Sequence, residues 1–460
     1  MRHTPFFHGR ARALKPCHHA APCMHSLTLC TRNNIRPDAA TLLLPLANVP
    51  DRLVPLLPLF SRCLTEMGTA RRDFTELGEL MAAKTGGVGA DTLLGTVRES
   101  RHTVSYLGVS GKAVYDKLPD LFAIMQEILL EPLTDQAVIE ERLGQMLLEA
   151  KARMENALQS AGHAAVSARL RARFTGAGAL AERTSGLSYL ESVRSMLQRL
   201  EQEPQTLMAD LEELRGRIVA RPGAIFDCTA EAAGLVLAET QARQLLQALP
   251  PVRSGAASGI GESPMSLPEA EAFIAPAQIN YVGKAANIYD QGYVYHGSAS
   301  VILRYLRMGY LWERVRVRGG AYGAFCNLDR LGGTLVCASY RDPNVEDTLA
   351  AFDGMAEYLR GFSPDKAQLT QAIVGAIGDI DSYQLPDAKG AQSLSRWLTD
   401  DNEAARALMR EEILSTTEKH FREFAEVLAE AARTGATCVL GGPKTEAAAS
   451  KLGWSSTKLV

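Results

Sequence analysis

Three arginines alternate with valines between residues 314 and 318, and their type and spacing could serve chemistry. In a β-strand, residues two positions apart point to the same face, so Arg314, Arg316 and Arg318 would form one basic face. Such a face is either simply solvated or recognises an anion or the backbone of a substrate. The spacing alone leaves both interpretations open.

The arginines lead into a glycine-rich segment that contains a tyrosine. Gly319, Gly320 and Gly323 remove side chains around Ala321 and Tyr322, which lets another backbone approach closely. A guanidinium and a phenol beside bare backbone could hold a peptide carbonyl and the oxyanion that develops on it during cleavage. A glycine-rich hairpin with an exposed basic face is the alternative without chemistry.

Other motifs are weaker candidates. Residues 86–89 lack the glycine spacing of phosphate-binding loops, and residues 84–86 match a β-lactamase tripeptide without its partner motifs. Asp379 and Asp381 could act as paired carboxylates, but they also suit a cap or loop near Pro386. None of the nine histidines begins an H-x-x-E-H or H-E-x-x-H motif, so the sequence predicts no metal ligands in this chain.

The elements that must position these residues fall into two parts. Residues 251–268 are rich in Gly, Ser and Pro and are typical of an inter-domain linker. We therefore expect one domain over 38–250 and another over 269–445, with a leader at 1–37 and a tail at 446–460. Each of the two predicted domains has an ordinary domain size.

Hydrophobic spacing predicts the main elements of both parts. The first part contains a helix within Thr134–Ser160, and the second a helix from Ser298 to about Trp312. Segments 314–329 and 332–340 are predicted to pair as a hairpin. Because strands and helices segregate along the chain, we expect an α+β fold. The predicted buried face of the second helix consists of Val301, Ile302, Tyr305, Leu306, Met308 and Trp312.

Composition excludes several classes of protein. The net charge of −3 does not suit a globally basic nucleic-acid binder. The sequence has no run of 18 uncharged apolar residues, so we expect no membrane span. The eight cysteines form no C-x-x-C pair, which is typical of free thiols in a reducing compartment.

Residues 1–37 differ from the rest of the chain. They hold six Lys or Arg, five His and no acid, and the remaining residues carry a net charge of −9. An Arg-rich segment without acids is typical of an organelle transit peptide. A disordered start is the alternative interpretation.

Several long segments resemble the presequence proteases, organellar members of the pitrilysin/insulinase-like zinc peptidases with an inverted H-x-x-E-H motif. The resemblance runs from about residue 42 to 440, and the plant-type organellar enzyme looks closest. The segments are LPLFSRCLTEMGT (57–69), LMAAKTGGVGA (80–90), SAGHAAVSARLRARF (160–174), SGLSYLE (185–191), LWERVRVRGGAYGAFCNLD (311–329), SYRDPNVEDTLAAFDG (339–354) and IGDIDSYQLPDAKG (377–390).

The resemblance implies four homologous α+β domains, each a mainly antiparallel sheet with packed helices, in two halves that close around a peptide. This chain would be the C-terminal half, with a non-catalytic third domain at 38–250 and a fourth domain at 269–445. The fourth domain would supply Arg316, which binds the substrate backbone, and Tyr322, which donates a hydrogen bond to the oxyanion. The backbone at Gly319, Gly320 and Ala321 would lie beside the substrate.

The resemblance also implies a Zn²⁺ cofactor whose ligands, with the general base, lie in an N-terminal half that is not in this chain. We therefore expect the substrate-clamping half of a zinc metalloendopeptidase of the mitochondrial matrix and/or chloroplast stroma. Its partners would be short unfolded peptides and the zinc-binding half, in cis or in trans. The alternative is a non-catalytic peptidase-like binding or scaffold protein, which the missing zinc ligands favour and Arg316 and Tyr322 oppose.

Overall fold

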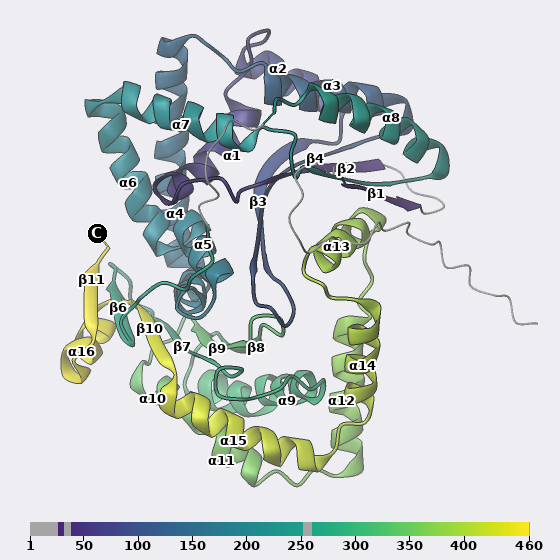
Figure 1. Ribbon diagram of the computed structural model, residues 1–460. Helices are drawn as coiled ribbons and strands as arrows, with labels where there is room; N and C mark the ends of the chain where they lie inside the picture. Colours follow the sequence, from purple (N-terminus) through teal and green to yellow (C-terminus); the bar gives the residue numbers. More distant parts are fainter. Residues whose placement is uncertain (1–25, 32–37, 252–259, 460) are drawn as a thin grey trace, which may run out of the picture.

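The computed structural model describes residues 26–31, 38–251 and 260–459. The described residues form two sheets, each packed against helices, as the α+β prediction required (Figure 1). The long helix α4 (Gln136–Ala172) links the two sheets on one side and α13 (Pro386–Leu398) on the other, because α4 contacts the second sheet and α13 contacts the first. None of the helices in these ranges is long and apolar enough to cross a membrane.

The first sheet has the strand order β1-β5-β2-β4-β3, antiparallel except for the pair β1–β5. Strand β1 lies within the predicted leader 1–37, so the sheet extends into that segment; residues 1–25 and 32–37 lie outside the described residues. The strands are β1 (Ser26–Thr31), β2 (Asp38–Pro45), β3 (Val88–Thr96), β4 (Thr103–Ala113) and β5 (Ile225–Ala230).

Alternation along β2 divides the first sheet into two faces. Leu42 and Leu44 point into the main core of this part, whereas Leu43 points the other way and packs with Ile225 and with Leu394 of α13. The helical elements of this part, besides α4, are η1 (Asp51–Leu56), α1 (Leu57–Glu66), α2 (Phe74–Lys84), η2 (Tyr115–Lys117), α3 (Leu118–Leu130), α5 (Gly176–Ser185), α6 (Leu187–Gln202), α7 (Pro204–Ile218) and α8 (Ala232–Ala248).

The second sheet has the order β11-β6-β10-β7-β9-β8, so β8 forms one edge. Its strands are β6 (Ala270–Ile274), β7 (Tyr281–Asn287), β8 (Gly323–Leu328), β9 (Thr334–Tyr340), β10 (Ala436–Gly441) and β11 (Ser455–Lys458). Its helical elements, besides α13, are α9 (Ser298–Leu306), η3 (Arg307–Arg318), α10 (Glu346–Asp353), α11 (Met355–Arg360), α12 (Lys366–Ile380), α14 (Glu403–Leu414), α15 (Glu418–Thr434) and α16 (Pro443–Leu452).

Helix α4 crosses from one part of the fold to the other. It begins where the sequence predicted, with the Asp135 side chain accepting hydrogen bonds from two backbone amides of the first turn. It kinks at Ala161, and its second half packs Val166 and Leu170 against the second sheet. A side chain at Gly162 would lie 2.4 Å from the Tyr281 ring, so the close approach of helix and sheet requires glycine there.

The predicted strand over the three arginines is wrong. Residues 307–318 continue α9 as the π-helix η3, and the hairpin strand β8 begins only at Gly323. A π-helix bonds residues five apart, so buried positions recur about every four to five residues instead of three to four. The buried residues follow that spacing, and Met308 and Trp312, predicted to be buried, are 57% and 47% exposed; the buried set is Leu306, Tyr310, Leu311 and Val315.

Asp227 lies on the face of the first sheet that α13 covers. It is 6% exposed, and its carboxylate has no hydrogen-bond or ion-pair partner among the described residues. Burial raises the pKa of this carboxyl to about 7. It lines a cavity of about 320 Å³ together with Lys112 and Asp387, which pair with each other.

Replacing Asp227 with asparagine is expected to stabilise the fold at pH 8 by about 1–3 kcal/mol, because the amide stays neutral at a pH where the buried carboxyl must ionise. Because the folded-state pKa is raised, the native chain loses stability as pH rises from about 4, the unfolded value, through about 7. The free energy of unfolding of the variant, measured in urea, should not show this fall between pH 5 and 8. Asp91→Asn, at an exposed position of β3, is the control; equal slopes for all three proteins would contradict the assignment.

Candidate functional site

The turn that carries Tyr322 is held between η3 and β9. The Ala321 amide donates to the Val315 carbonyl at 3.1 Å, and the Tyr322 amide donates to the Tyr340 carbonyl at 3.0 Å. The Asn344 side chain donates to the Gly319 carbonyl at 2.6 Å. These bonds fix the path of the chain from the helix into the edge strand.

Glycine is required in this turn for local reasons. A side chain at Gly319 would lie 2.6 Å from the Val315 carbonyl oxygen, and Gly320 has a φ of +78°, which favours glycine. Ala321 is 3% exposed, side chain and backbone together, so it offers a ligand little surface. The substrate contacts of these three residues stay predictions.

Arg316 lies between two aromatic rings. Its guanidinium carbon is 4.2 Å from the centroid of the Trp312 ring and 5.2 Å from that of Tyr322. Cations are attracted to the faces of aromatic rings, so Trp312 and Tyr322 hold the guanidinium in place. The structure thus brings together the two residues predicted to be catalytic, Arg316 and Tyr322.

The other two arginines of the segment have different surroundings. Arg318 pairs with Glu313 at 2.8 Å, and Arg314 lies 6.0 Å from the Tyr310 ring centroid. Among the described residues, Arg316 has no acidic partner. The three guanidiniums therefore do not form the single basic face that a strand would have given, and Arg316 alone is directed to Tyr322.

Tyr322 is available to a ligand. Its side chain is 63% exposed, and its ring packs edge-on against Tyr340, with centroids 5.5 Å apart. Its hydroxyl has no hydrogen-bond partner among the described residues, so it is free to donate one. The backbone of Tyr322 is fixed by β9 and its ring by Tyr340, which together present the phenol at the surface.

Sequence reasoning missed Trp312 as a site residue, because it was assigned to the buried face of a regular helix. The signal that could have found it is its position four residues before Arg316, a spacing that places side chains together on a helix. Its half-exposed ring contacts the guanidinium that also contacts Tyr322.

The weaker candidates have structural explanations. Asp379 pairs with Arg304 at 2.5 Å, and Asp381 pairs with Arg410 at 2.7 Å, so the two carboxylates serve separate ion pairs. Within the described ranges, no group of three or more His, Cys, Asp or Glu side chains is arranged to hold a metal ion. The part of the chain that the structure describes therefore does not fit a zinc site.

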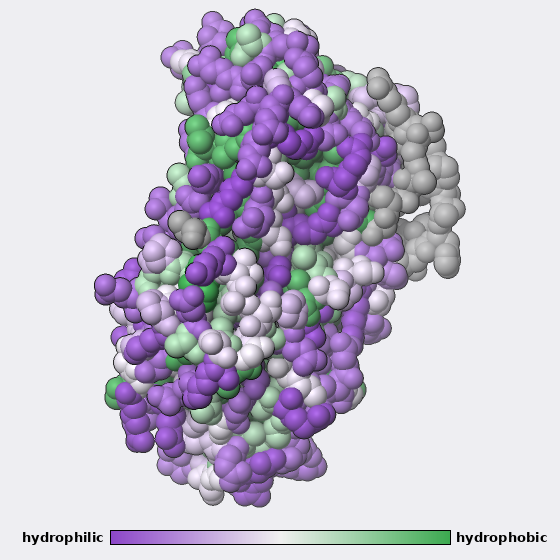
Figure 2. Space-filling model, turned by 90° about the vertical axis from the view of Figure 1, so that its left-hand side faces the viewer, coloured by the Kyte–Doolittle hydropathy of each residue, from purple (hydrophilic) through white to green (hydrophobic). Residues whose placement is uncertain are grey.

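Figure 2 shows the side of the molecule that is on the left in Figure 1, where α6 and α16 lie. Polar residues predominate there, and apolar residues form small separate groups. That face has the character of an ordinary protein surface, and we place no site on it.

Two family descriptions match separate parts of the chain. "PreP C-terminal domain" matches residues 270–440, which contain Arg316 and Tyr322, and a region associated with subfamily C of the M16 peptidases matches residues 40–196. Among solved structures, the fold is similar to the peptidase M16 inactive domain from Pseudomonas fluorescens, with 16% identity and a TM-score of 0.63 over 91% of this chain and 96% of that one. The periplasmic protease PqqL from Escherichia coli matches with 13% identity and a TM-score of 0.57, over 90% of this chain and 44% of that one.

Curated relatives agree with the family descriptions. Presequence protease 1, chloroplastic/mitochondrial, of Arabidopsis thaliana is 41% identical over 83% of this chain and 35% of its own length. The mitochondrial presequence protease of Emericella nidulans is 26% identical over 90% of this chain and 39% of its own length. The chain thus spans between a third and two fifths of the length of these relatives. On both the family descriptions and these relatives, the chain belongs to the presequence protease family of M16 peptidases.

Proposed function

We propose that this chain is the substrate-clamping, C-terminal half of an organellar zinc metalloendopeptidase that degrades cleaved targeting peptides and other short unfolded peptides. The observation that carries the proposal is the pairing of Arg316 with an exposed Tyr322, 5.2 Å from guanidinium carbon to ring centroid. A scaffold has no need for a phenol that is held in place with its hydroxyl free.

In this function, the Arg316 guanidinium binds a carbonyl of the extended substrate, while Trp312 keeps that guanidinium above the turn. The Tyr322 hydroxyl donates a hydrogen bond to the oxygen that gains negative charge as the peptide bond is attacked. A zinc ion held by the other half would supply the activated water. Because the described residues offer no ligand set for zinc, we do not expect this chain to hydrolyse peptides by itself.

The partner would be a zinc-binding N-terminal half with an H-x-x-E-H motif, in the same polypeptide or separate from it. The predicted regions 38–250 and 269–445 would be the third and fourth domains of the complete enzyme. The names of the relatives support the mitochondrial matrix and/or chloroplast stroma as the location.

A second function is a non-catalytic peptidase-like protein that binds peptides or supports a partner. The lack of a metal-binding group within the described residues favours it. It differs from the first proposal in one measurable respect, because a scaffold would not add turnover to a zinc-bearing half.

The test is to mix the purified chain with a separately produced zinc-bearing half of a presequence protease and to follow cleavage of a fluorogenic peptide. We expect no turnover from the chain alone and zinc-dependent turnover on mixing. If the mixture is no more active than the zinc-bearing half alone, although the two proteins bind each other, the scaffold function is correct.

A further inference from the structure

A large cavity lies at the C-terminal end of the edge strand β8, whose last residues line it. Its volume is about 1360 Å³, and its walls come from α9, the β8–β9 turn and helices α12, α13 and α14. Seven of its lining residues are cationic and four are acidic. The cations are Arg304, Arg307, Arg330, Lys389, Arg396, Arg406 and Arg410, and the acids are Asp379, Asp381, Asp401 and Glu403.

Around Asp401, positive charges outnumber negative ones. Its carboxylate is 5% exposed; Arg330 donates to Oδ2, and Arg396 lies 3.8 Å from the same oxygen. Arg406 donates to the backbone carbonyl of Asp401. Three guanidiniums therefore gather around one residue, two at its carboxylate and one at its backbone carbonyl. Burial, together with Arg406 and Arg330, lowers the pKa of Arg396, as expected where positive charge is in excess.

Cations also outnumber carboxylates on another wall of the cavity. Arg304 and Arg307 share Asp379, at 2.5 and 3.7 Å. Lys389 of α13 has no acidic partner among the described residues and lies 5.8 Å from the ring centroid of Tyr383. Partly buried cations that outnumber the carboxylates around them favour an anionic ligand, since charge-assisted hydrogen bonds to such a ligand are the strong ones.

Strand β8 connects the candidate site to the cavity. Tyr322 directly precedes β8, and Asn327 of β8 lines the cavity. At about 3.3 Å per residue of strand, these two residues lie roughly 16 Å apart along β8. An extended peptide of about five residues spans that distance, and β8 is an edge strand along which it can lie.

We propose that this cavity binds the C-terminal carboxylate of a substrate peptide while an upstream peptide bond lies at Arg316 and Tyr322. The inference rests on the proposed function and adds the end of the substrate that is recognised. The excess of cations provides the affinity, and the length of β8 sets the number of residues between the bound terminus and the site.

The test uses two fluorescent unfolded peptides of the same sequence, one with a free C-terminal carboxylate and one with a C-terminal amide. Their binding to the full chain is measured by anisotropy titration at low salt. We expect the free acid to bind about tenfold more tightly, a preference that higher salt reduces. Lys389→Gln breaks no ion pair, so it should leave the fold intact and reduce the preference severalfold. Arg396→Gln should do the same, because Asp401 keeps Arg330. Arg433→Gln, on the distant exposed pair with Glu430, is the control.

A third peptide, amidated but ending in glutamate, separates terminal from side-chain carboxylates. Binding like that of the amide supports recognition of the terminus, and binding like that of the free acid overturns that part of the proposal. If acid and amide bind equally well, the cavity has no role in carboxylate recognition, while the proposed function stands. If none of the peptides binds at millimolar concentration, the proposed function itself fails.

Discussion

Replacing Tyr322 with phenylalanine should lower kcat of the assembled enzyme about 100-fold, the usual effect of removing one donor from an oxyanion site. The change removes only the hydroxyl, and the ring can keep its packing on Tyr340 and its contact with Arg316. Because the oxyanion exists only in the transition state and the intermediate, KM should change little. The measurement is steady-state hydrolysis of a fluorogenic peptide by the chain mixed with the zinc-bearing half.

Tyr340→Phe is the matched control, because it removes the hydroxyl from the neighbouring ring and leaves Tyr322 unchanged. We expect its kcat to stay within about twofold of the original, against the loss of two orders of magnitude expected of an oxyanion donor. An unchanged kcat for Tyr322→Phe would show that the phenol has no part in the reaction. A raised KM with unchanged kcat would instead assign Tyr322 to substrate binding.

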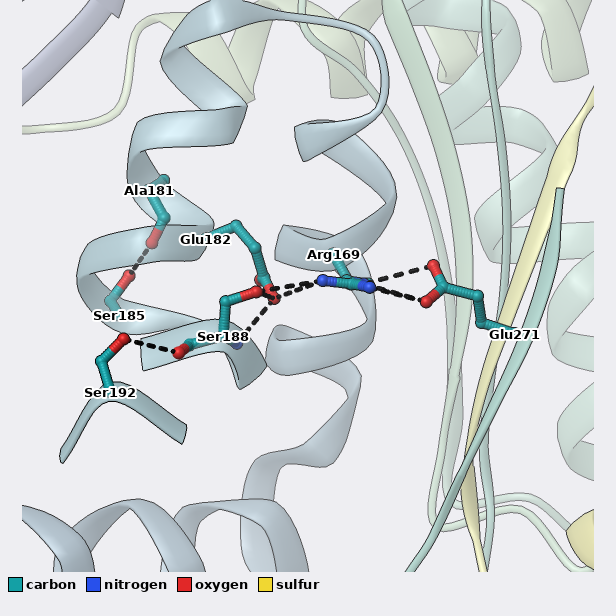
Figure 3. Close-up of polar contacts among 7 residues, drawn as sticks. All are labelled: Arg169, Ala181, Glu182, Ser185, Ser188, Ser192 and Glu271. Atoms are coloured by element: carbon teal, nitrogen blue, oxygen red, sulfur yellow. Dashed lines mark hydrogen bonds and ion pairs between the residues drawn. The ribbon is translucent and has the colours of Figure 1, made fainter. Parts of the chain in front are cut away.

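The second large effect concerns Arg169 of α4, which lies between two buried carboxylates (Figure 3). Its guanidinium is 2.7 Å from Glu271 of β6 and 3.4 Å from Glu182 of α5, and it donates to the Ser188 hydroxyl at 3.0 Å. Glu182 is fully buried and Glu271 is 7% exposed. Arg169 thus ties α4 and α5 to a strand of the second sheet.

Arg169→Leu leaves both carboxylates buried without their cation. We expect the free energy of unfolding to fall by about 3–5 kcal/mol, as when one partner of a buried pair is removed. The measurement is urea unfolding followed by circular dichroism. Arg433→Leu breaks an exposed pair with Glu430 and should cost at most about 1 kcal/mol.

The loss of stability caused by Arg169→Leu should also depend on pH. Burial already raises the pKa of Glu182, and Arg169 opposes that rise. Without the guanidinium the folded-state pKa of Glu182 rises further, so the variant loses less stability at pH 5, where the carboxyl takes up a proton more readily, than at pH 8. A loss as small as that of Arg433→Leu, or one independent of pH, would contradict the role assigned to this cluster.

Local patterns in the sequence were sufficient for several of the elements and for the closeness of the candidate pair. The helix within Thr134–Ser160 formed with Leu143 and Met146 on its buried face, and the hairpin of β8 with β9 was confirmed. Arg316 and Tyr322 are only six residues apart, so any compact turn between helix and strand would bring them near each other. Their roles in catalysis stay predictions.

What could not be predicted depends on contacts between distant segments or on an unusual helix. Apolar spacing assumes a regular helix, so it gave the wrong environment for Trp312 once residues 307–318 formed a π-helix. The cavity charges around Asp401 come from the β8–β9 turn and two different helices. The packing of Leu394 on Leu43 and Ile225 joins segments more than 160 residues apart. No local periodicity carries that information.

The two attachments between the sheets restrict how the molecule can move. Helix α4 fastens the first part to the second sheet, and α13 fastens the second part to the first sheet at a separate place. A single connection would act as a hinge, but two separate ones oppose rotation of either sheet about the other. A peptide that binds at Arg316 and Tyr322 should therefore displace both sheets as one rigid body, with no rotation of one sheet against the other.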